Sequence, residues 1–263
     1  MAWVARGLRN GVVTSRYPRR ADPYARGFRG AVTVGEPVAG AGGDLGAICP
    51  TGAIGAAGGE VTVDRGRCIL CGGCVTARPD LFAWAAGSET AQLDRAQLVV
   101  PTGLHEDPAA IEHARAELAR RVSALRRSVH IRHVDTGSDG SEEWEIHALT
   151  NPTYDVHRLG IFFTASPRHA DILMLTGAGA RGMIAPLRRT YEAMPNPIVV
   201  IAVGTDAISG GLVSPSYATS GGVGGALDVD VVVPGSPPPP FVILHGILLA
   251  LGRCAASRTR DAS

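Results

Sequence analysis

The pattern of hydrophobic and polar positions changes along the chain, and each stretch predicts a different kind of structure. Residues 1–30 are rich in Arg, Pro and Gly and predict an extended N-terminal arm. Residues 105–129 repeat apolar side chains at helical spacing with arginines on the other face, so they predict an amphipathic helix. Between these two stretches, short apolar segments alternate with glycine-rich turns and predict strands at residues 31–34, 60–64 and 96–100.

The second half of the chain alternates continuous apolar runs with helical patterns. The apolar runs predict buried strands at residues 159–166, 170–177, 198–204 and 228–235. The helical patterns cover residues 182–194 and 240–252. Strands that are buried on both faces are typical of parallel sheets, and their alternation with helices predicts an α/β domain.

These patterns divide the chain into five regions. We expect an arm over 1–30, a small domain over 31–100, a linker helix over 101–129, an α/β domain over 130–253 and a polar tail over 254–263.

Composition limits the classes of partner. With 45% hydrophobic residues the 263-residue chain can bury a core, and its net charge of +1 argues against nucleic acid as a partner. The longest apolar run, 241–252, is shorter than the roughly 20 residues that span a bilayer, and residues 1–20 contain no apolar secretory segment. We therefore expect a cytoplasmic protein, which could still associate with a membrane complex.

The cysteines carry the clearest chemical signal. Cys68, Cys71 and Cys74 follow the spacing C-x2-C-x2-C, and Arg78 then stands before Pro79 where a bacterial iron–sulfur motif has its fourth cysteine. In two-cluster ferredoxins that fourth cysteine binds the other cluster. The dipeptide Cys49-Pro50 therefore provides the end of an upstream motif.

Counting back from Cys49 at the same spacing shows which cluster is missing. One set of ligand positions has lost every cysteine, and the other retains all four. The lost positions are Ala39, Gly42, Leu45 and Arg78; the retained cysteines are Cys49, Cys68, Cys71 and Cys74. This pattern predicts one [4Fe–4S] cluster, because zinc cysteines usually occur as two separated pairs, and buried inert thiols are the remaining alternative. For Arg78 we expect a solvated loop arginine without a partner.

Several segments of the sequence resemble known protein families. "CPTGAI" (49–54) and "RCILCGGC" (67–74) resemble bacterial-type ferredoxin subunits. The second half resembles the small subunit of group 4 [NiFe]-hydrogenases and the homologous B-type subunit of NADH-quinone oxidoreductase, through residues 130–161, 165–197, 200–211 and 233–240. The resemblance implies an α/β and α+β fold class: a ferredoxin-like 4Fe-4S domain, a linker helix and a flavodoxin-like parallel-sheet domain.

The same resemblance implies a proximal [4Fe–4S] cluster, but its four cysteine positions are altered. They are occupied by Asp139, Glu142, Asp206 and Ser236. Hard oxygen ligands do not suit iron–sulfur clusters, so we expect no proximal cluster. Three interpretations stay open: a vestigial pocket, a Mg²⁺ or Ca²⁺ site, and proton handling. Glu143, at a position where the hydrogenase family carries a glutamate associated with proton transfer, favours proton handling over a cation.

Other candidates carry weaker signals. Four histidines are expected to be packing or surface residues: His130, His133, His169 and His245. The glycine-rich segment 177–182 lacks the spacing of a nucleotide-binding loop. Cys254 is expected to be a free thiol without function.

Taken together, the motifs and the resemblance predict a non-catalytic iron–sulfur electron-transfer subunit of an oxidoreductase complex. The complex would be related to complex I or to group 4 hydrogenases, with a large subunit and membrane ion-transporting subunits as partners. The chain would then lie peripherally on the inner face of the cell membrane. The alternative is a non-redox scaffold that couples such a complex to ion transport.

Overall fold

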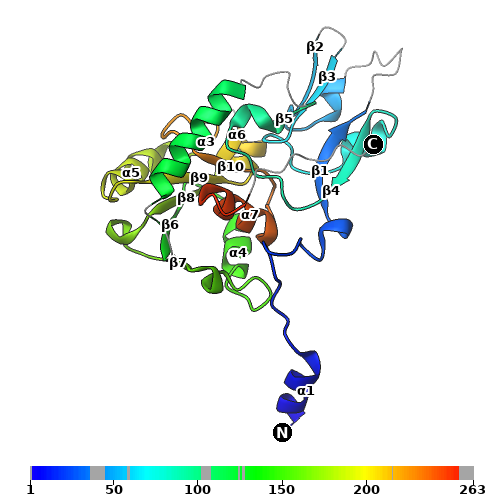
Figure 1. Ribbon diagram of the computed structural model, residues 1–263. Coiled ribbons are helices and arrows are strands. Elements are labelled where there is room, and N and C mark those ends of the chain that lie inside the picture. Colours follow the sequence, from blue (N-terminus) through cyan, green and yellow to red (C-terminus); the bar gives the residue numbers. More distant parts are fainter. Residues whose placement is uncertain are drawn as a thin grey trace.

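Five parallel strands form the centre of the larger part of the structure (Figure 1). They are β6 (Val129–Asp135), β7 (Ile161–Phe163), β8 (Ile172–Thr176), β9 (Val199–Val203) and β10 (Val231–Val233). This computed structural model describes residues 2–35, 45–57, 60–101, 108–123, 125, 128–214 and 216–254. The strands lie in the order β7-β6-β8-β9-β10, and every pairing between them is parallel. In chain order this is 2-1-3-4-5, the flavodoxin-like arrangement, so the expected fold of this part is confirmed.

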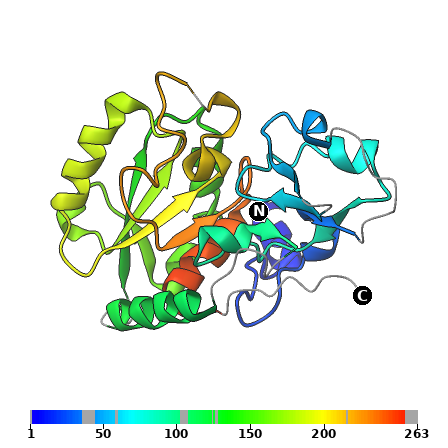
Figure 2. The same cartoon turned by 90° about the horizontal axis from the view of Figure 1, so that it is seen from above.

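Helices cover both faces of this sheet because its strands are apolar on both sides. All five residues of β8 and of β9 are buried. Alternate side chains point to opposite faces, so Met174 joins one core and Leu173 joins the other. Figure 2 shows α5 on one side of the sheet and α7 on the other. The helices of this part are α3 (Pro108–Val122), α4 (Ser141–Ala148), α5 (Arg181–Glu192), α6 (Thr205–Ser209) and α7 (Pro240–Ala250).

The smaller part contains antiparallel strands around a third core. β1 (Arg29–Val34) pairs with β4 (Phe82–Ala86), while β3 (Glu60–Asp64) pairs with both β2 (Ile54–Ala57) and β5 (Val99–Val100). The short helix α2 spans Gly73–Ala77. The buried core is made by Val32, Leu45, Ile54, Val61, Val63, Leu81, Phe82 and Val100. Single turns of 3-10 helix complete the structure at Ala25–Gly27, Leu45–Ile48, Arg95–Leu98, Val156–Leu159, Pro167–His169 and Gly211–Val213.

Residues 91–98 join the two parts. Gln92 and Val232 exchange both backbone hydrogen bonds, at 2.9 and 3.0 Å, so this segment pairs with the outer edge of β10. Ala91 and Leu93 pack into the core that contains α7, and Leu98 packs into the core that contains α5. Residues 91–93 and Leu98 are therefore buried against the parallel sheet, while residues 94–97 between them are half-buried.

The linker helix is shorter than expected. α3 ends at Val122, and β6 begins at Val129, within the range assigned to the helix; residues 102–107 lie outside the described residues. Arg121 fixes α3 to the sheet, because its guanidinium pairs with Asp230 and donates to the Ile198 carbonyl oxygen at 2.8 Å.

Three other expectations differ from the structure. The N-terminal arm is not extended throughout, since residues Ala2–Asn10 form helix α1. The strand expected at 96–100 is mostly a 3-10 helix, because Asp94 and Gln97 form a capping box at its start. β6 was missed because "VHIRHVD" places His and Arg between its apolar residues. Among the helices of the described residues, none is both long enough and apolar enough to cross a bilayer.

Because the central strands are buried on both faces, truncating one of their side chains should cause a large loss of stability. Leu173 in β8 is 0% exposed, so Leu173→Ala should lower the free energy of unfolding by about 2–5 kcal/mol. The matched change Leu212→Ala, at a side chain that is 63% exposed, should alter it by less than about 0.5 kcal/mol. Urea unfolding followed by circular dichroism measures both. Equal losses in the two variants would contradict the observed packing.

Candidate functional site

Cys68 and Cys71 lie on the loop that connects β3 to α2, Cys74 is the second residue of α2, and this loop depends on left-handed backbone conformations. Leu70 has φ of +56° and Gly72 has φ of +76°. A Cβ atom at Gly72 would lie 2.8 Å from Cζ2 of Trp84, so only glycine fits between the loop and this indole ring. The turn brings three cysteines that are close in sequence around one point.

Cys49 reaches the same point from the 3-10 helix at Leu45–Ile48. The Ala53 amide donates to Cys49 Sγ at 3.2 Å, and Thr51 Oγ1 lies 3.4 Å from the same sulfur. Burial alone would raise the pKa of Cys49, but hydrogen bonds from Thr51, Ala53 and Ile54 outweigh it and lower that pKa. The local backbone therefore favours a thiolate at Cys49.

All four expected cysteines line one small cavity, together with apolar side chains that include Val32, Ile54 and Val63. Three of the thiols, on Cys49, Cys68 and Cys74, pack against the third core, and Cys71 is exposed. Burial raises the pKa of Cys68 to about 11, and the like charges of the other three cysteines add to the shift. The structure thus brings together the residues that the sequence predicted.

The donor set of this cavity fits an iron–sulfur cluster. Four soft sulfur donors surround the space, and backbone amides such as those of Ala53 and Leu70 point at sulfur atoms. Thiolates with amide hydrogen bonds are the environment that such clusters require. Over the described part of the chain, no three Cys, His, Asp or Glu side chains are grouped closely enough to hold a single metal ion. The four cysteines line one cavity and are not grouped closely enough to bind a single metal ion.

Two of the four positions that lack the expected cysteine have other roles. Leu45 is 4% exposed and belongs to the third core. Arg78 forms a two-pronged ion pair with Asp80, with Nη2 2.7 Å from Oδ2, so the expectation that it has no partner was wrong. Ala39 and Gly42 lie outside the described residues.

The altered proximal positions lie at the carboxyl ends of three parallel strands. Asp139 follows β6, Asp206 follows β9 in the first turn of α6, and Ser236 follows β10. Glu142 occupies the first turn of α4, also after β6. Carboxyl ends of parallel strands meet at one edge of a sheet, where ligands bind in folds of this type.

Glu142 is the buried member of this carboxylate group, with 1% of the residue exposed. Burial, reinforced by the charges of Asp206 and Asp139, raises the pKa of Glu142 to about 7. Burial and the charge of Asp139 raise the pKa of Asp206 as well. Gly204 makes room for Glu142, since a Cβ atom there would lie 2.5 Å from Glu142 Oε1. The pocket therefore favours a protonated carboxyl near neutral pH.

Asp139 and Ser236 lie at the solvent side of this group. Asp139 Oδ1 accepts a hydrogen bond from the Ser141 hydroxyl at 2.6 Å, which lowers the pKa of Asp139. The same hydroxyl lies 3.2 Å from Glu142 Oε2. Ser236 is exposed. The three carboxylates are thus electrostatically coupled, although they are not placed as ligands of one ion.

Glu143 belongs to a second network on the neighbouring side of α4. Its carboxylate accepts hydrogen bonds from Thr176 Oγ1 at 2.5 Å and from Ser138 Oγ at 2.8 Å. His133 Nε2 lies 2.9 Å from Thr176 Oγ1 and 3.4 Å from Glu143 Oε1. Burial lowers the pKa of His133, which favours its neutral ring. The network links two titratable groups through one hydroxyl.

Sequence reasoning missed His133, Thr176 and Ser138 as members of this network. His133 was expected to be a packing or surface residue, and a hydrogen-bonded role replaces that expectation. Their positions in the sequence could have indicated the network. Thr176 ends one strand and Ser138 follows another, and both strands end at the same edge of the sheet. The other histidines agree better with the expectation: His130 stacks on Phe162, His169 is exposed and His245 is buried in α7.

One hydrogen bond connects the cysteine loop with the carboxylate edge. Thr205 Oγ1 donates to the Cys68 carbonyl oxygen at 3.1 Å, and Thr205 immediately precedes Asp206. A Cβ atom at Gly66 would lie 2.9 Å from Ile208 Cγ2, so the loop also packs tightly against α6. The two candidate sites are therefore neighbours, which sequence separation alone could not indicate.

Cys254 lies apart from this site. Its thiol is free and partly buried against the core that contains α7, and burial together with the charge of Glu89 raises its pKa to about 12. The rest of the expected tail, residues 255–263, lies outside the described residues.

The buried Glu142 predicts a pH-dependent stability. Its folded pKa of about 7 exceeds the ordinary value of 4.5, so its contribution is full below about pH 4.5 and is lost as the pH rises through about 7. Wild type should lose about 3 kcal/mol of unfolding free energy over this range relative to Glu142→Gln. Urea unfolding at several pH values measures the difference. The control Glu192→Gln, at the exposed end of α5, should follow the wild-type profile, and parallel profiles for Glu142→Gln would contradict the prediction.

Comparison with known proteins identifies a family and relatives for the second half of the chain. The family described as "NADH ubiquinone oxidoreductase, 20 Kd subunit" matches residues 140–250, so the cysteine loop lies outside the matched range. "Formate hydrogenlyase subunit 7" of Escherichia coli (strain K12) is 40% identical over 134 residues, 51% of this chain and 52% of that protein. The chain thus spans about half the length of that relative.

Two further relatives match the same half. "Probable membrane-bound hydrogenase subunit mbhJ" of Pyrococcus furiosus is 39% identical over 145 residues, which cover 54% of this chain and 87% of that protein. A B-type subunit of the NADH-quinone oxidoreductase of Rhizobium etli is 43% identical over 105 residues, 40% of this chain and 62% of that protein. With a relative of this identity matched over most of its length, the chain belongs to the family of the NADH ubiquinone oxidoreductase 20 Kd subunit.

Proposed function

We propose that this chain is an electron-transfer subunit that carries one [4Fe–4S] cluster on Cys49, Cys68, Cys71 and Cys74. The observation that carries the proposal is the arrangement of these four thiols around one cavity, although Cys49 is distant from the others in sequence. When bound, the cluster would supply one-electron transfer. The proximal site would hold no second cluster, since it offers oxygen donors.

The residues around the cavity would influence how readily the cluster is reduced. Amide hydrogen bonds to sulfur, such as that from Ala53 to Cys49, stabilise negative charge on the ligands and favour a reduced cluster. The third core partly covers three of the thiols, and Cys71 is left at the surface where an electron partner could approach. Thr205 holds the carbonyl oxygen of Cys68 and so fixes the loop against α6.

The relatives support the kind of complex in which this subunit would act. Their names describe subunits of a formate hydrogenlyase, a membrane-bound hydrogenase and an NADH-quinone oxidoreductase. We infer that the chain assembles with a large subunit of the hydrogenase or complex I type and with membrane ion-transporting subunits. Its position would then be peripheral, on the inner face of the cell membrane.

A second function is favoured by the carboxylate edge. Glu142 is buried with a pKa of about 7, and Glu143 shares a hydroxyl with His133. A carboxyl with the pKa of Glu142 can take up and release protons near neutral pH. The chain would then couple proton movement to its partners, with or without electron transfer. A non-redox scaffold would keep this second function and lose the first.

Iron content tests the electron-transfer proposal. The full chain purified without oxygen should contain about four irons and show the absorbance of one cubane cluster. Cys71→Ser should abolish the absorbance, because removing one thiolate leaves an iron without its soft ligand. Iron quantitation with EPR of the reduced protein measures both.

Two variants serve as controls. Cys254→Ser removes a thiol that lies outside the cavity, and Ser236→Ala removes the hydroxyl of the altered proximal position. Both should keep the wild-type iron content. About eight irons per chain, or loss of the signal in Ser236→Ala, would contradict the single-cluster proposal, and an iron-free protein would favour the scaffold.

A further inference from the structure

Helix α1 presents an unpartnered apolar face at one end of the molecule. In Figure 1 it stands away from the rest of the chain, at the bottom of the view, and none of its residues is buried. Trp3 is 78% exposed and Leu8 is 80% exposed. At 100° per residue, Trp3, Val4 and Leu8 share one side of the helix, while Arg6 and Arg9 occupy the other.

The charge of the N-terminal segment has a single sign. Residues 2–20 contain five arginines and no acidic residue: Arg6, Arg9, Arg16, Arg19 and Arg20. The apolar side chains Val12 and Val13, which are 90% and 55% exposed, lie between the two groups of arginines. Apolar and cationic groups thus alternate along a short stretch, although the whole chain carries a net charge of only +1.

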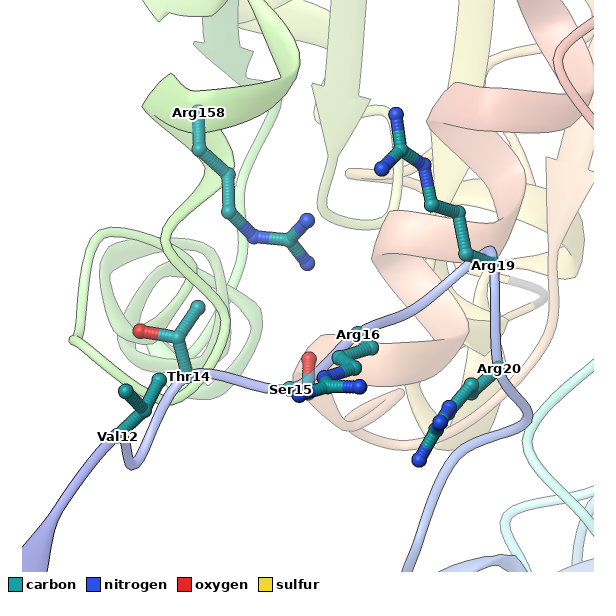
Figure 3. A pocket seen from close by; sticks show the side chains of 7 residues that line it. All are labelled: Val12, Thr14, Ser15, Arg16, Arg19, Arg20 and Arg158. Atoms are coloured by element: carbon teal, nitrogen blue, oxygen red, sulfur yellow. The ribbon is translucent and has the colours of Figure 1, made fainter.

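The second group of arginines forms a pocket with the α/β part. Arg16, Arg19, Arg20 and Arg158 line a cavity of about 470 Å³ together with Ser15. Figure 3 shows the guanidinium group of Arg158 directed toward the segment that carries Ser15. The Ser15 hydroxyl is buried and has no hydrogen-bond partner among the described residues. The guanidinium groups that line the pocket suit an oxygen-rich anion, and the buried Ser15 hydroxyl lies beside them without a partner in the described part of the chain.

This pocket is fixed to the core. Tyr17 is 1% exposed and its ring packs edge-on against Phe241, with ring centroids 5.7 Å apart. The Ser15 amide donates to the Thr153 carbonyl oxygen at 2.8 Å, and Arg158 Nη2 donates to the Tyr17 carbonyl oxygen at 2.7 Å. A ligand held here would be held by the folded protein, and not only by a loose terminus.

We propose that residues 2–20 and Arg158 dock this chain directly on an anionic phospholipid surface. The arginine pocket takes the phosphate of a lipid headgroup, which guanidinium groups bind in a fork geometry. α1 lies in the interface with Trp3 and Leu8 toward the acyl chains and with Arg6 and Arg9 toward the headgroups. An acidic protein partner explains the arginines but not the adjoining apolar face of such a short helix. The contact does not depend on the cysteine cavity.

Vesicle sedimentation of the full chain tests this contact. Binding should be strong to vesicles that contain phosphatidylglycerol, weak to vesicles of phosphatidylcholine alone, and reduced by salt. The triple change Arg16→Ala, Arg19→Ala and Arg20→Ala should lower the partition coefficient about 100-fold, because each basic residue near such a surface adds to the attraction. The matched control removes three exposed arginines of α5, on another side of the molecule (Figures 1 and 2): Arg181, Arg188 and Arg189. That control should lower binding far less.

The helix is tested separately. Trp3→Ala with Leu8→Ala should weaken binding to the same vesicles at high salt, where the apolar contribution dominates. Wild-type fluorescence should shift to the blue on binding, and Trp3→Phe should remove most of that shift. Iron content should stay unchanged in every variant, so that failure of this contact is distinguishable from failure of the cluster.

Several outcomes would overturn the proposal. Equal binding to neutral and anionic vesicles, or equal losses of binding in the two triple variants, would show that the arginine pocket does not bind the membrane. Binding of inorganic phosphate without binding of vesicles would make the pocket a site for a soluble anion. Absence of any vesicle binding would leave an acidic protein surface as the occupant.

Discussion

The hydrogen bond from the Thr205 hydroxyl to the Cys68 carbonyl oxygen joins regions that are 137 residues apart in sequence. Thr205 begins α6 directly after a buried strand, so its position is set by the parallel sheet and not by the loop that it contacts. The cysteine loop thereby lies at the edge of the sheet where the acidic residues gather. A change in the shape of the cysteine loop would therefore shift α6 and Asp206 within it.

The two neighbouring sites have opposite chemistry. Around the cysteines, soft sulfur donors and amide hydrogen bonds suit the proposed cluster. Around Glu142, burial and crowded carboxylates favour a bound proton. Gain of negative charge at the first site would raise proton affinity at the second, because like charges nearby disfavour an ionised carboxyl. Under the proposed function, electron arrival at the cluster would therefore favour proton uptake at Glu142.

Sequence predicted the features that depend on local pattern. Continuous apolar runs located β8, β9 and β10, and cysteine spacing located four residues that meet in space. It failed where distant contacts decide the outcome. Val129 and Ile131 of β6 join one core and Val134 joins the other, although His and Arg interrupt these apolar residues. The partner of Arg78 was missed for a different reason, because Asp80 is only two residues away and the pair is local. His133 joined Glu143 only because the fold brings β6, β8 and α4 to one edge.

The pairing of Gln92 with β10 has a consequence for assembly. An uncovered edge strand exposes backbone groups on which a strand of another chain can form further hydrogen bonds. Here both backbone hydrogen bonds at Val232 are taken up by a segment of the same chain. This border of the sheet is closed to strand exchange and to edge-to-edge aggregation, so a neighbouring subunit meeting this side would have to rely on side chains.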